Sequence, residues 1–231
     1  MLSDNAAPSA AIQRQWSEVD NYISSLLLGP DPVLDEALKA AASAGLPGIN
    51  VTANQGKLLC LLAQVRGAKN ILEIGTLGGY STIWLARSLQ NGGCVVTLEL
   101  EPDYAKVARA NIARAGLSER VELIVGPALE SLPKLAATGR GPFDFIFIDA
   151  NKEGYPSYLE WSLQLSRPGT VIIADNIVRN GEVVNPASAD IRVQGVRRFN
   201  ELVAANPRLS ATFIQTVGSK GYDGFAMAVV K

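Results

Sequence analysis

Carboxylate and amide side chains end two apolar runs of the chain, at residues 146–152 and 171–176. Both runs are rich in β-branched and aromatic residues, as buried strands are, and they stop at Asp149 and at Asp175 followed by Asn176. The stretch between them can hold one crossover helix, so the two strands can lie parallel and end at the same edge of a sheet. Open α/β sheets bind their ligands at that edge.

Three oxygen donors at one point suit a hard divalent cation, with Mg²⁺ as the first expectation and Ca²⁺ or Mn²⁺ as alternatives. We therefore predict a metal site formed by Asp149, Asp175 and Asn176. The plainer alternative is that Asp and Asn end these strands only because they favour turns.

Lys152 follows Asp149 by three residues, on the turn that leaves the first of these strands. A lysine in this place can reach a hydroxyl group bound beside the carboxylates and accept its proton, whereas a solvated loop lysine is the alternative. The sequence contains no histidine, so a Ser-His-Asp triad, a Cys-His pair and a histidine-ligated metal are all excluded within it. A general base must be Lys, Asp, Glu or Tyr, and we predict Lys152 and Asp149 as the catalytic residues.

A strand, a glycine-rich turn and the start of a helix follow one another in residues 71–85. Glu73 lies two residues before Gly75, where glycine lets the backbone approach a ligand closely. The dinucleotide pattern G-x-G-x-x-G does not fit, because Leu77 and Tyr80 occupy its second and third glycine positions. A carboxylate here repels a pyrophosphate but attracts an ammonium or sulfonium group. We predict a cofactor contact, with a turn that needs glycine only for packing as the alternative.

Two further segments are predicted to contact the same ligand. Glu99 ends the next strand, and an acid in that position of such folds can accept both hydroxyl groups of a ribose. Pro127 and Ala128 follow the third strand and would form the adenine side of the crevice.

Composition excludes several classes of function. The 231-residue chain is 48% hydrophobic, which is enough for one large core, and its net charge of -1 offers no basic surface for nucleic acid. The N-terminus lacks the order of a signal peptide, and no apolar stretch is long enough to span a bilayer. Cys60 and Cys94 are too few for a disulfide framework. We expect a cytoplasmic protein that acts on a small molecule, without nucleic-acid or membrane partners.

The pattern of elements predicts an α/β fold, a doubly wound, mostly parallel seven-stranded sheet with a C-terminal antiparallel hairpin and N-terminal helices. Strands are expected near residues 70–74, 94–99, 120–125, 143–149 and 169–175, alternating with helices near 79–90, 102–115, 127–136, 155–166 and 190–205. Two closing strands, 211–217 and 224–230, are joined by a short link and must be antiparallel. Helices near 10–28, from 33 onward and 53–65 precede this core.

The segments E-x-G-x-x-x-G-Y-S, V-T-L-E, V-G-P-A, F-I-D-A-N-K and A-D-N occur in that order. Together they resemble the cation-dependent S-adenosylmethionine O-methyltransferases of the catechol and caffeoyl-CoA type, over roughly residues 45–231. The resemblance implies a class I, Rossmann-like methyltransferase domain at 51–231. It also implies that the helical segment 1–50 covers the site and packs across a homodimer.

The resemblance assigns roles to residues of this chain. It implies that Glu73, the backbone of Gly75 and the hydroxyl group of Ser81 hold the methionine part of S-adenosylmethionine, with a backbone contact from Val51. Glu99 matches the acid that binds the ribose. The remaining matches are Pro127 and Ala128 at the adenine, Asp149 beside both cofactor and metal, Asp175 and Asn176 at the metal, and Lys152 as the base.

The predicted reaction is methyl transfer from S-adenosylmethionine to a hydroxyl group of a vicinal dihydroxy aromatic, either a small phenol or a caffeoyl-CoA-like thioester. A divalent cation would acidify and orient the hydroxyl pair. Two alternatives stay open: a nicotinamide-dependent oxidoreductase, and a catalytically silent, dimeric module that binds S-adenosylmethionine. Arg179 and Asn180, in the loop after the second acidic strand ending, are candidate acceptor contacts, with an exposed and solvated loop arginine as the alternative.

Overall fold

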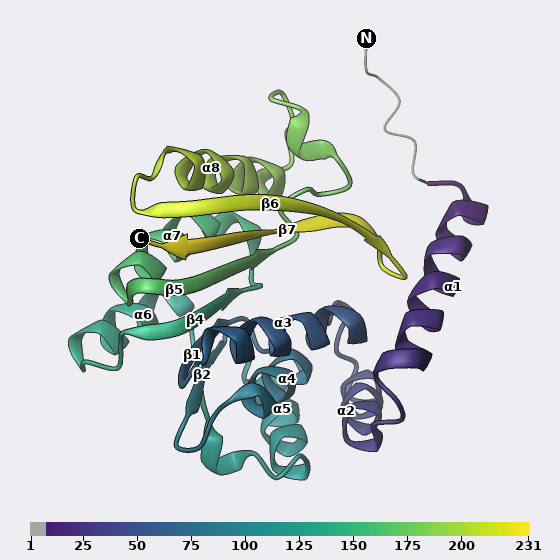
Figure 1. Ribbon diagram of the computed structural model, residues 1–231, viewed down its shortest axis with the longest axis horizontal. Coiled ribbons are helices and arrows are strands. Elements are labelled where there is room, and N and C mark those ends of the chain that lie inside the picture. The colour runs from purple at the N-terminus through teal and green to yellow at the C-terminus, as the bar shows by residue number, and fades with distance from the viewer. Residues whose placement is uncertain (1–7) are drawn as a thin grey trace.

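The computed structural model describes residues 8–231, and these form eight α-helices around one seven-stranded sheet (Figure 1). The strands are β1 (Asn70–Ile74), β2 (Cys94–Glu99), β3 (Val121–Val125), β4 (Phe143–Ile148), β5 (Ser166–Asp175), β6 (Leu209–Gly218) and β7 (Gly221–Val230). The α-helices are α1 (Ala10–Leu27), α2 (Pro32–Ser43), α3 (Ala53–Arg66), α4 (Tyr80–Ser88), α5 (Pro102–Arg114), α6 (Ala128–Ala137), α7 (Tyr155–Gln164) and α8 (Ile191–Ala205). Residues 1–7 of the predicted N-terminal segment lie outside the described residues.

The strand order is β3-β2-β1-β4-β5-β7-β6. β1 to β5 pair in parallel, while β7 is antiparallel to both β5 and β6. This arrangement confirms the predicted doubly wound sheet with its closing hairpin. The register aligns Ile74 with Ile148 and Ile148 with Ala174, so β1, β4 and β5 end together at one edge.

The two faces of the sheet carry separate cores, because alternate side chains of a strand point to opposite faces. Ile146 and Ile148 of β4 pack in the core under α6, α7 and α8, whereas Phe145 and Phe147 pack in the core under α3 and α4. Every residue of β4 is buried, and the run is apolar apart from Asp144. The helices on both faces fix the strand ends that carry the candidate site (Figure 1).

Two boundaries differ from the prediction. The closing strands are longer than expected, and only Ser219 and Lys220 join them, because Gly218 pairs with Gly221 and extends the ladder through a segment that reads as a loop. β5 begins at Ser166, since an irregular register beside Phe143 lets the strand start before the apolar run.

The first helix lies beside the tip of the β6–β7 hairpin (Figure 1). Gln13 donates a hydrogen bond from Nε2 to the carbonyl oxygen of Gly218 at 2.9 Å, and the backbone N–H of Ser219 donates to Asp20 Oδ2 at 2.7 Å. None of the residues of α1 is buried. Polar contacts therefore hold this helix on the rest of the molecule.

The two cysteines are free, with Cys60 buried and Cys94 partly exposed. No helix in the part of the chain from residue 8 onward is both long and apolar enough to cross a membrane.

Candidate active site

A cavity of about 940 Å³ opens at the carboxyl ends of β1, β2 and β4. It is lined by nearly all the residues predicted to contact a cofactor: Val51, Gly75, Ser81, Glu99, Pro127, Ala128 and Asp149. Helix α2 closes one side through Ala37, Leu38, Ala41 and Ala42. The predicted cofactor residues thus lie around one space, although they come from six separate segments of the chain.

Glu73 lies beneath this cavity and is fully buried. Its carboxylate accepts hydrogen bonds from three hydroxyl groups, those of Ser81 at 2.6 Å, Thr82 at 2.5 Å and Thr97 at 2.7 Å. Burial raises the pKa of Glu73 to about 7, while these hydrogen bonds act in the opposite direction. Ser81 joins the buried acid to the cavity wall, so a cationic group bound beside Ser81 would favour the ionised form of Glu73.

Glu99 is bonded to the backbone of the glycine-rich turn. Its Oε2 accepts from the N–H groups of Thr76 at 3.2 Å and Leu77 at 2.6 Å, and its Oε1 accepts from Glu101 N at 3.0 Å. A carboxylate has further acceptor positions beyond these three bonds. Glu99 is therefore held rigidly at the cavity and can still bind hydroxyl groups.

Gly75 has a structural requirement as well as a place in the cavity. Its φ is +102°, and a Cβ atom there would lie 2.1 Å from the carbonyl oxygen of Asp149. The ends of β1 and β4 can approach this closely only with glycine at position 75. Glycine is thus required here for packing, which brings Asp149 beside the turn, while the cofactor contact of Gly75 stays a prediction.

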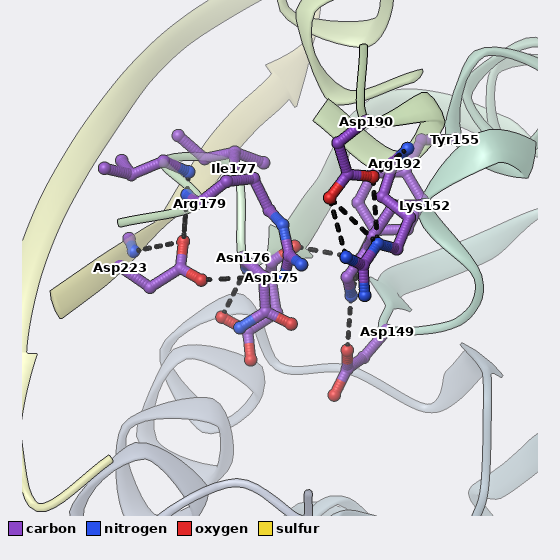
Figure 2. A network of polar contacts seen from close by, with 12 residues as sticks. Asp149, Lys152, Tyr155, Asp175, Asn176, Ile177, Arg179, Asp190, Arg192 and Asp223 are labelled. Carbon is purple, nitrogen blue, oxygen red and sulfur yellow. Dashed lines mark hydrogen bonds and ion pairs between the residues drawn. The ribbon is translucent and has the colours of Figure 1, made fainter. Parts of the chain in front are cut away.

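Asp149 and Asp175 follow and end neighbouring strands, and Asn176 comes next with a left-handed φ of +57°. In the view of Figure 2, Asp175 and Asn176 lie between Asp223 with Arg179 on one side and Asp149 with Lys152 on the other. Burial, followed by the charge of Asp149, raises the pKa of Asp175 to about 7. The structure therefore brings the predicted metal ligands together as two neighbouring carboxylates, with the amide of Asn176 beside them.

This donor set fits a divalent cation, since hard cations prefer carboxylate and amide oxygens and would relieve the repulsion between the two acids. Within residues 8–231, no group of three or more His, Cys, Asp and Glu side chains is placed to hold a metal ion. The predicted set differs from such a group because an asparagine supplies its third oxygen.

Lys152 is 8% exposed and begins the short 3₁₀ turn η2 (Lys152–Gly154) after β4. Its Nζ atom donates to Asp149 Oδ1 at 2.9 Å and to the hydroxyl oxygen of Tyr155 at 2.7 Å. Lys152, Asp149 and Asn176 all line the large cavity. The alternative of a solvated loop lysine is wrong, because the amine is buried and held at the predicted metal ligands.

Two residues organise this region in ways that the sequence did not indicate: Tyr155, expected only to flank the pocket, and Asp223. Tyr155 is fully buried, and its hydroxyl group donates to the carbonyl oxygen of Asp175 at 2.9 Å. Asp223, on β7, accepts from the N–H groups of Val178 at 3.0 Å and Arg179 at 2.9 Å. Tyr155 follows Lys152 by three residues at the start of a helix, and this spacing could have indicated that the two side chains meet. Asp223 comes from a distant part of the sequence, so no local spacing indicated its contacts.

A second cavity, of about 280 Å³, lies on the other side of Asp175 and Asn176, between α3 and the β6–β7 hairpin. Lys220, at the hairpin tip, lines it and donates from Nζ to the carbonyl oxygens of Gly48 and Asn50. These bonds fix the loop that carries Val51, a residue common to both cavities.

Known proteins resemble this chain over almost its full length. A catechol O-methyltransferase of Niastella koreensis is 53% identical over 94% of this chain and 98% of its own. A catechol O-methyltransferase of Mycobacterium tuberculosis is 51% identical over 93% of this chain and 96% of its own.

Solved structures agree in fold and in sequence. An O-methyltransferase from Bacillus cereus, in complex with S-adenosylhomocysteine (SAH), superposes with a TM-score of 0.94 at 60% identity, over 95% of this chain and 100% of that one. The O-methyltransferase TomG from Streptomyces achromogenes is involved in tomaymycin synthesis, and its structure is in complex with S-adenosylmethionine (SAM). It superposes with a TM-score of 0.92 at 51% identity, over 95% of this chain and 98% of that one. The family model described as O-methyltransferase matches residues 24–227. With most of its length matched, the chain belongs to the O-methyltransferase family.

Proposed function

We propose that this protein transfers a methyl group from S-adenosylmethionine to one hydroxyl group of a vicinal dihydroxy aromatic, with a divalent cation bound at the site. The observation that carries the proposal is the buried Lys152 amine, held by Asp149 and Tyr155 at the wall of the cofactor-sized cavity. Family membership favours this reaction over a nicotinamide-dependent oxidoreductase or a silent binding module. The names of the catechol O-methyltransferase relatives support the acceptor class.

The cofactor fits the cavity by charge and by position. Its methionine part would lie at Ser81, above the buried Glu73 and beside the Gly75 backbone and Val51. Its ribose would bind Glu99, and its adenine would lie at Pro127 and Ala128. This order would run from β1 toward β3 along the cavity wall.

The metal would be held by Asp149, Asp175 and Asn176, whose oxygen atoms match a hard cation. When bound, a divalent cation supplies acidification and orientation of the hydroxyl groups that face it. Mg²⁺ is the first candidate, and Ca²⁺ or Mn²⁺ would occupy the same type of oxygen site.

Lys152 would accept the proton of the attacking hydroxyl group. Two of its N–H positions are used by Asp149 and Tyr155, so the third can carry either the lone pair or the transferred proton toward the cavity. The acceptor oxygen then forms a bond to the methyl carbon as the carbon–sulfur bond breaks, which leaves S-adenosylhomocysteine. Burial excludes water, which would otherwise compete with the acceptor.

The proposal is tested by incubating the protein with S-adenosylmethionine and catechol, with phenol as the matched acceptor that lacks the second hydroxyl group. Each acceptor is assayed with added Mg²⁺ and with excess EDTA, and products are followed by mass spectrometry. We expect methylated catechol only in the presence of metal and little or no methylated phenol. Undiminished transfer in EDTA would remove the cation from the proposal.

We also propose that segment 1–50 covers the site and contributes to a homodimer. α2 closes the cavity, while α1 leaves the apolar side chains of Val19, Tyr22, Leu26 and Leu27 exposed. The edge strand β6 next to it exposes Phe213, Ile214 and Val217. A second copy of this chain would cover apolar side chains of both elements, because exposed apolar patches are typical of interaction surfaces.

A further inference from the structure

Arg179 is a mostly buried cation on the wall of the large cavity, in the loop that follows β5. Its side chain is 23% exposed, and its Nε atom is buried with no hydrogen-bond partner among residues 8–231. Its ion pair with Asp223 is long, at 4.0 Å between Nη1 and Oδ2. A guanidinium presents five N–H donors in a fixed fork, so this one retains donors for a further partner.

The backbone around Arg179 is held in an unfavourable conformation. Arg179 and Asn180 have φ values of +56° and +54°, which non-glycine residues seldom adopt. Asp223 stabilises the turn by accepting at Oδ1 from the N–H groups of Val178, Arg179 and Gly224. Backbone strain of this kind is found mostly at ligand clamps and active sites, where the surrounding structure maintains it. The loop thus holds Arg179 three residues from Asn176, a predicted metal ligand.

The other cations that line this cavity in the described chain are already paired. Lys152 is bonded to Asp149 and Tyr155. Arg192 binds Asp190 with two nitrogens, from Nε to Oδ1 at 3.0 Å and from Nη2 to Oδ2 at 2.6 Å, and this pairing lowers the pKa of Asp190 to about 2. Arg179 differs from both because its side chain makes no hydrogen bond within residues 8–231, and its one ion pair is long.

We infer that Arg179 binds a carboxylate on the methyl acceptor, so that the protein prefers dihydroxyaromatic carboxylates to neutral or cationic catechols. The inference rests on the proposed function, because it places the hydroxyl pair of the acceptor at Lys152 and Asn176. Arginine suits this role, since its planar fork matches the two oxygens of a carboxylate. The competing explanation is that Arg179 only balances the charges of Asp149, Asp175 and Asp223.

The test compares 3,4-dihydroxybenzoate with its methyl ester, which keeps the hydroxyl pair and removes the charge. We expect the wild-type protein to prefer the acid by at least about 10-fold in kcat/KM, on the scale of a charge-assisted hydrogen bond. Arg179→Met should lower kcat/KM for the acid by about 10- to 100-fold, mainly through KM, and change the ester less than about 3-fold. Arg179→Lys keeps the charge but loses the planar fork of the guanidinium. Its kcat/KM for the acid should lie between those of the wild type and Arg179→Met.

Arg192→Met is the matched control, because it removes a cation of the same cavity that is already paired. This variant should change kcat/KM for the acid and for the ester by the same factor. If Arg179→Met lowers acid and ester equally, Arg179 acts on the fold or on charge balance, and the inference is overturned. Caffeate and caffeoyl-CoA form a second pair, and an Arg179 dependence confined to the thioester would assign the arginine to phosphate instead.

Binding distinguishes this inference from the proposed function. Calorimetry measures the affinity of 3,4-dihydroxybenzoate for the protein loaded with S-adenosylhomocysteine and Mg²⁺, in wild type and in Arg179→Met. If neither acceptor is methylated but the acid still binds in an Arg179-dependent manner, the proposed reaction fails while the carboxylate site stands. If the acid binds both proteins equally, the carboxylate site fails whatever the activity.

Discussion

The hydroxyl oxygen of Tyr155 lies 2.7 Å from Nζ of Lys152 and 2.9 Å from the carbonyl oxygen of Asp175. One buried phenol thus joins the proposed base to the strand end that carries the proposed metal ligands. Because the phenol is fully buried, its distance from both groups is fixed by packing against Phe199 and Tyr158.

Tyr155→Phe removes this connection without changing the shape of the core. Lys152 loses one of its two hydrogen bonds and the buried carbonyl group of Asp175 loses a donor, which costs about 1–3 kcal/mol. We expect kcat to fall about 10-fold with little change in KM, and the pH profile of kcat to shift. Tyr158→Phe is the control, because that hydroxyl group bonds to Asn151 and not to Lys152. A loss of stability with an unchanged pH profile would limit Tyr155 to a structural role.

Lys152→Met removes the proposed base and retains most of the packing of the side chain. General-base removal lowers rates by about 10²-fold or more, so kcat should fall on that scale while S-adenosylmethionine still binds. Lys106→Met, which changes an exposed lysine on α5, should leave the rate unaltered. Equal rates for wild type and Lys152→Met would refute the assignment of the base.

Glu73 makes the stability of the cofactor-free protein depend on pH. Its pKa is about 7 in the folded protein and near 4.5 when unfolded, so the folded state binds more protons between these values. Stability should therefore decrease as pH rises from about 4.5 to about 7, by up to about 3 kcal/mol at 1.36 kcal/mol per pH unit. Denaturant titrations at pH 5 and pH 8 measure this difference.

Glu73→Gln should remove the part of the pH dependence that Glu73 contributes, while the part due to Asp175 persists. The same linkage predicts that affinity for S-adenosylmethionine rises with pH up to about 7 in the wild type, because its cationic groups favour the ionised carboxylate. A pH-independent affinity in the wild type would contradict this assignment.

Gly75→Ala should be strongly destabilising. The new Cβ atom would lie 2.1 Å from the backbone of Asp149, so β1 and β4 must separate or the turn must change conformation. We expect a loss of at least about 3 kcal/mol in urea denaturation, in addition to impaired activity. Gly92→Ala is the matched control, since Gly92 also has a positive φ but open space around it, and should cost only about 1 kcal/mol. Equal losses for both variants would show that backbone conformation, and not the close contact, is what requires Gly75.

The exposed apolar residues of α1 predict the oligomeric state. Light scattering after size exclusion should give twice the 24.5 kDa mass of the chain. Tyr22→Ser combined with Leu26→Ser should shift the protein toward the monomer, because both side chains are about two-thirds exposed on this helix. Val65→Ser changes an exposed apolar residue on α3 and should leave the protein dimeric. A monomeric wild-type protein would end the proposal of a dimer.

The sequence allowed the parallel part of the fold to be predicted well, because each central strand is a buried apolar run bounded by turn residues. The hairpin was less accessible: residues 218–223 are polar and glycine-rich, and their extended pairing depends on contacts with α1 that only the folded chain provides. The candidate site likewise contains residues that local sequence patterns indicate and residues that only long-range contacts bring in. Asp149, Asp175 and Lys152 could be found from local spacing, while Asp223 and the pairing state of Arg179 depend on segments that meet only in the folded molecule.

The attachment of α1 to the hairpin tip has a consequence for how the molecule is made. Gln13 and Asp20 bond to residues 205 and 199 positions later in the chain, which lie at the tip of the β6–β7 hairpin. A ribosome-bound chain that lacks these strands can join the first helix to α3 through Asn54 and Asp20, but the bonds of Gln13 and Asp20 to the hairpin form only after the strands are made. A change at the hairpin tip would therefore be felt at α1, some 200 residues earlier in the chain.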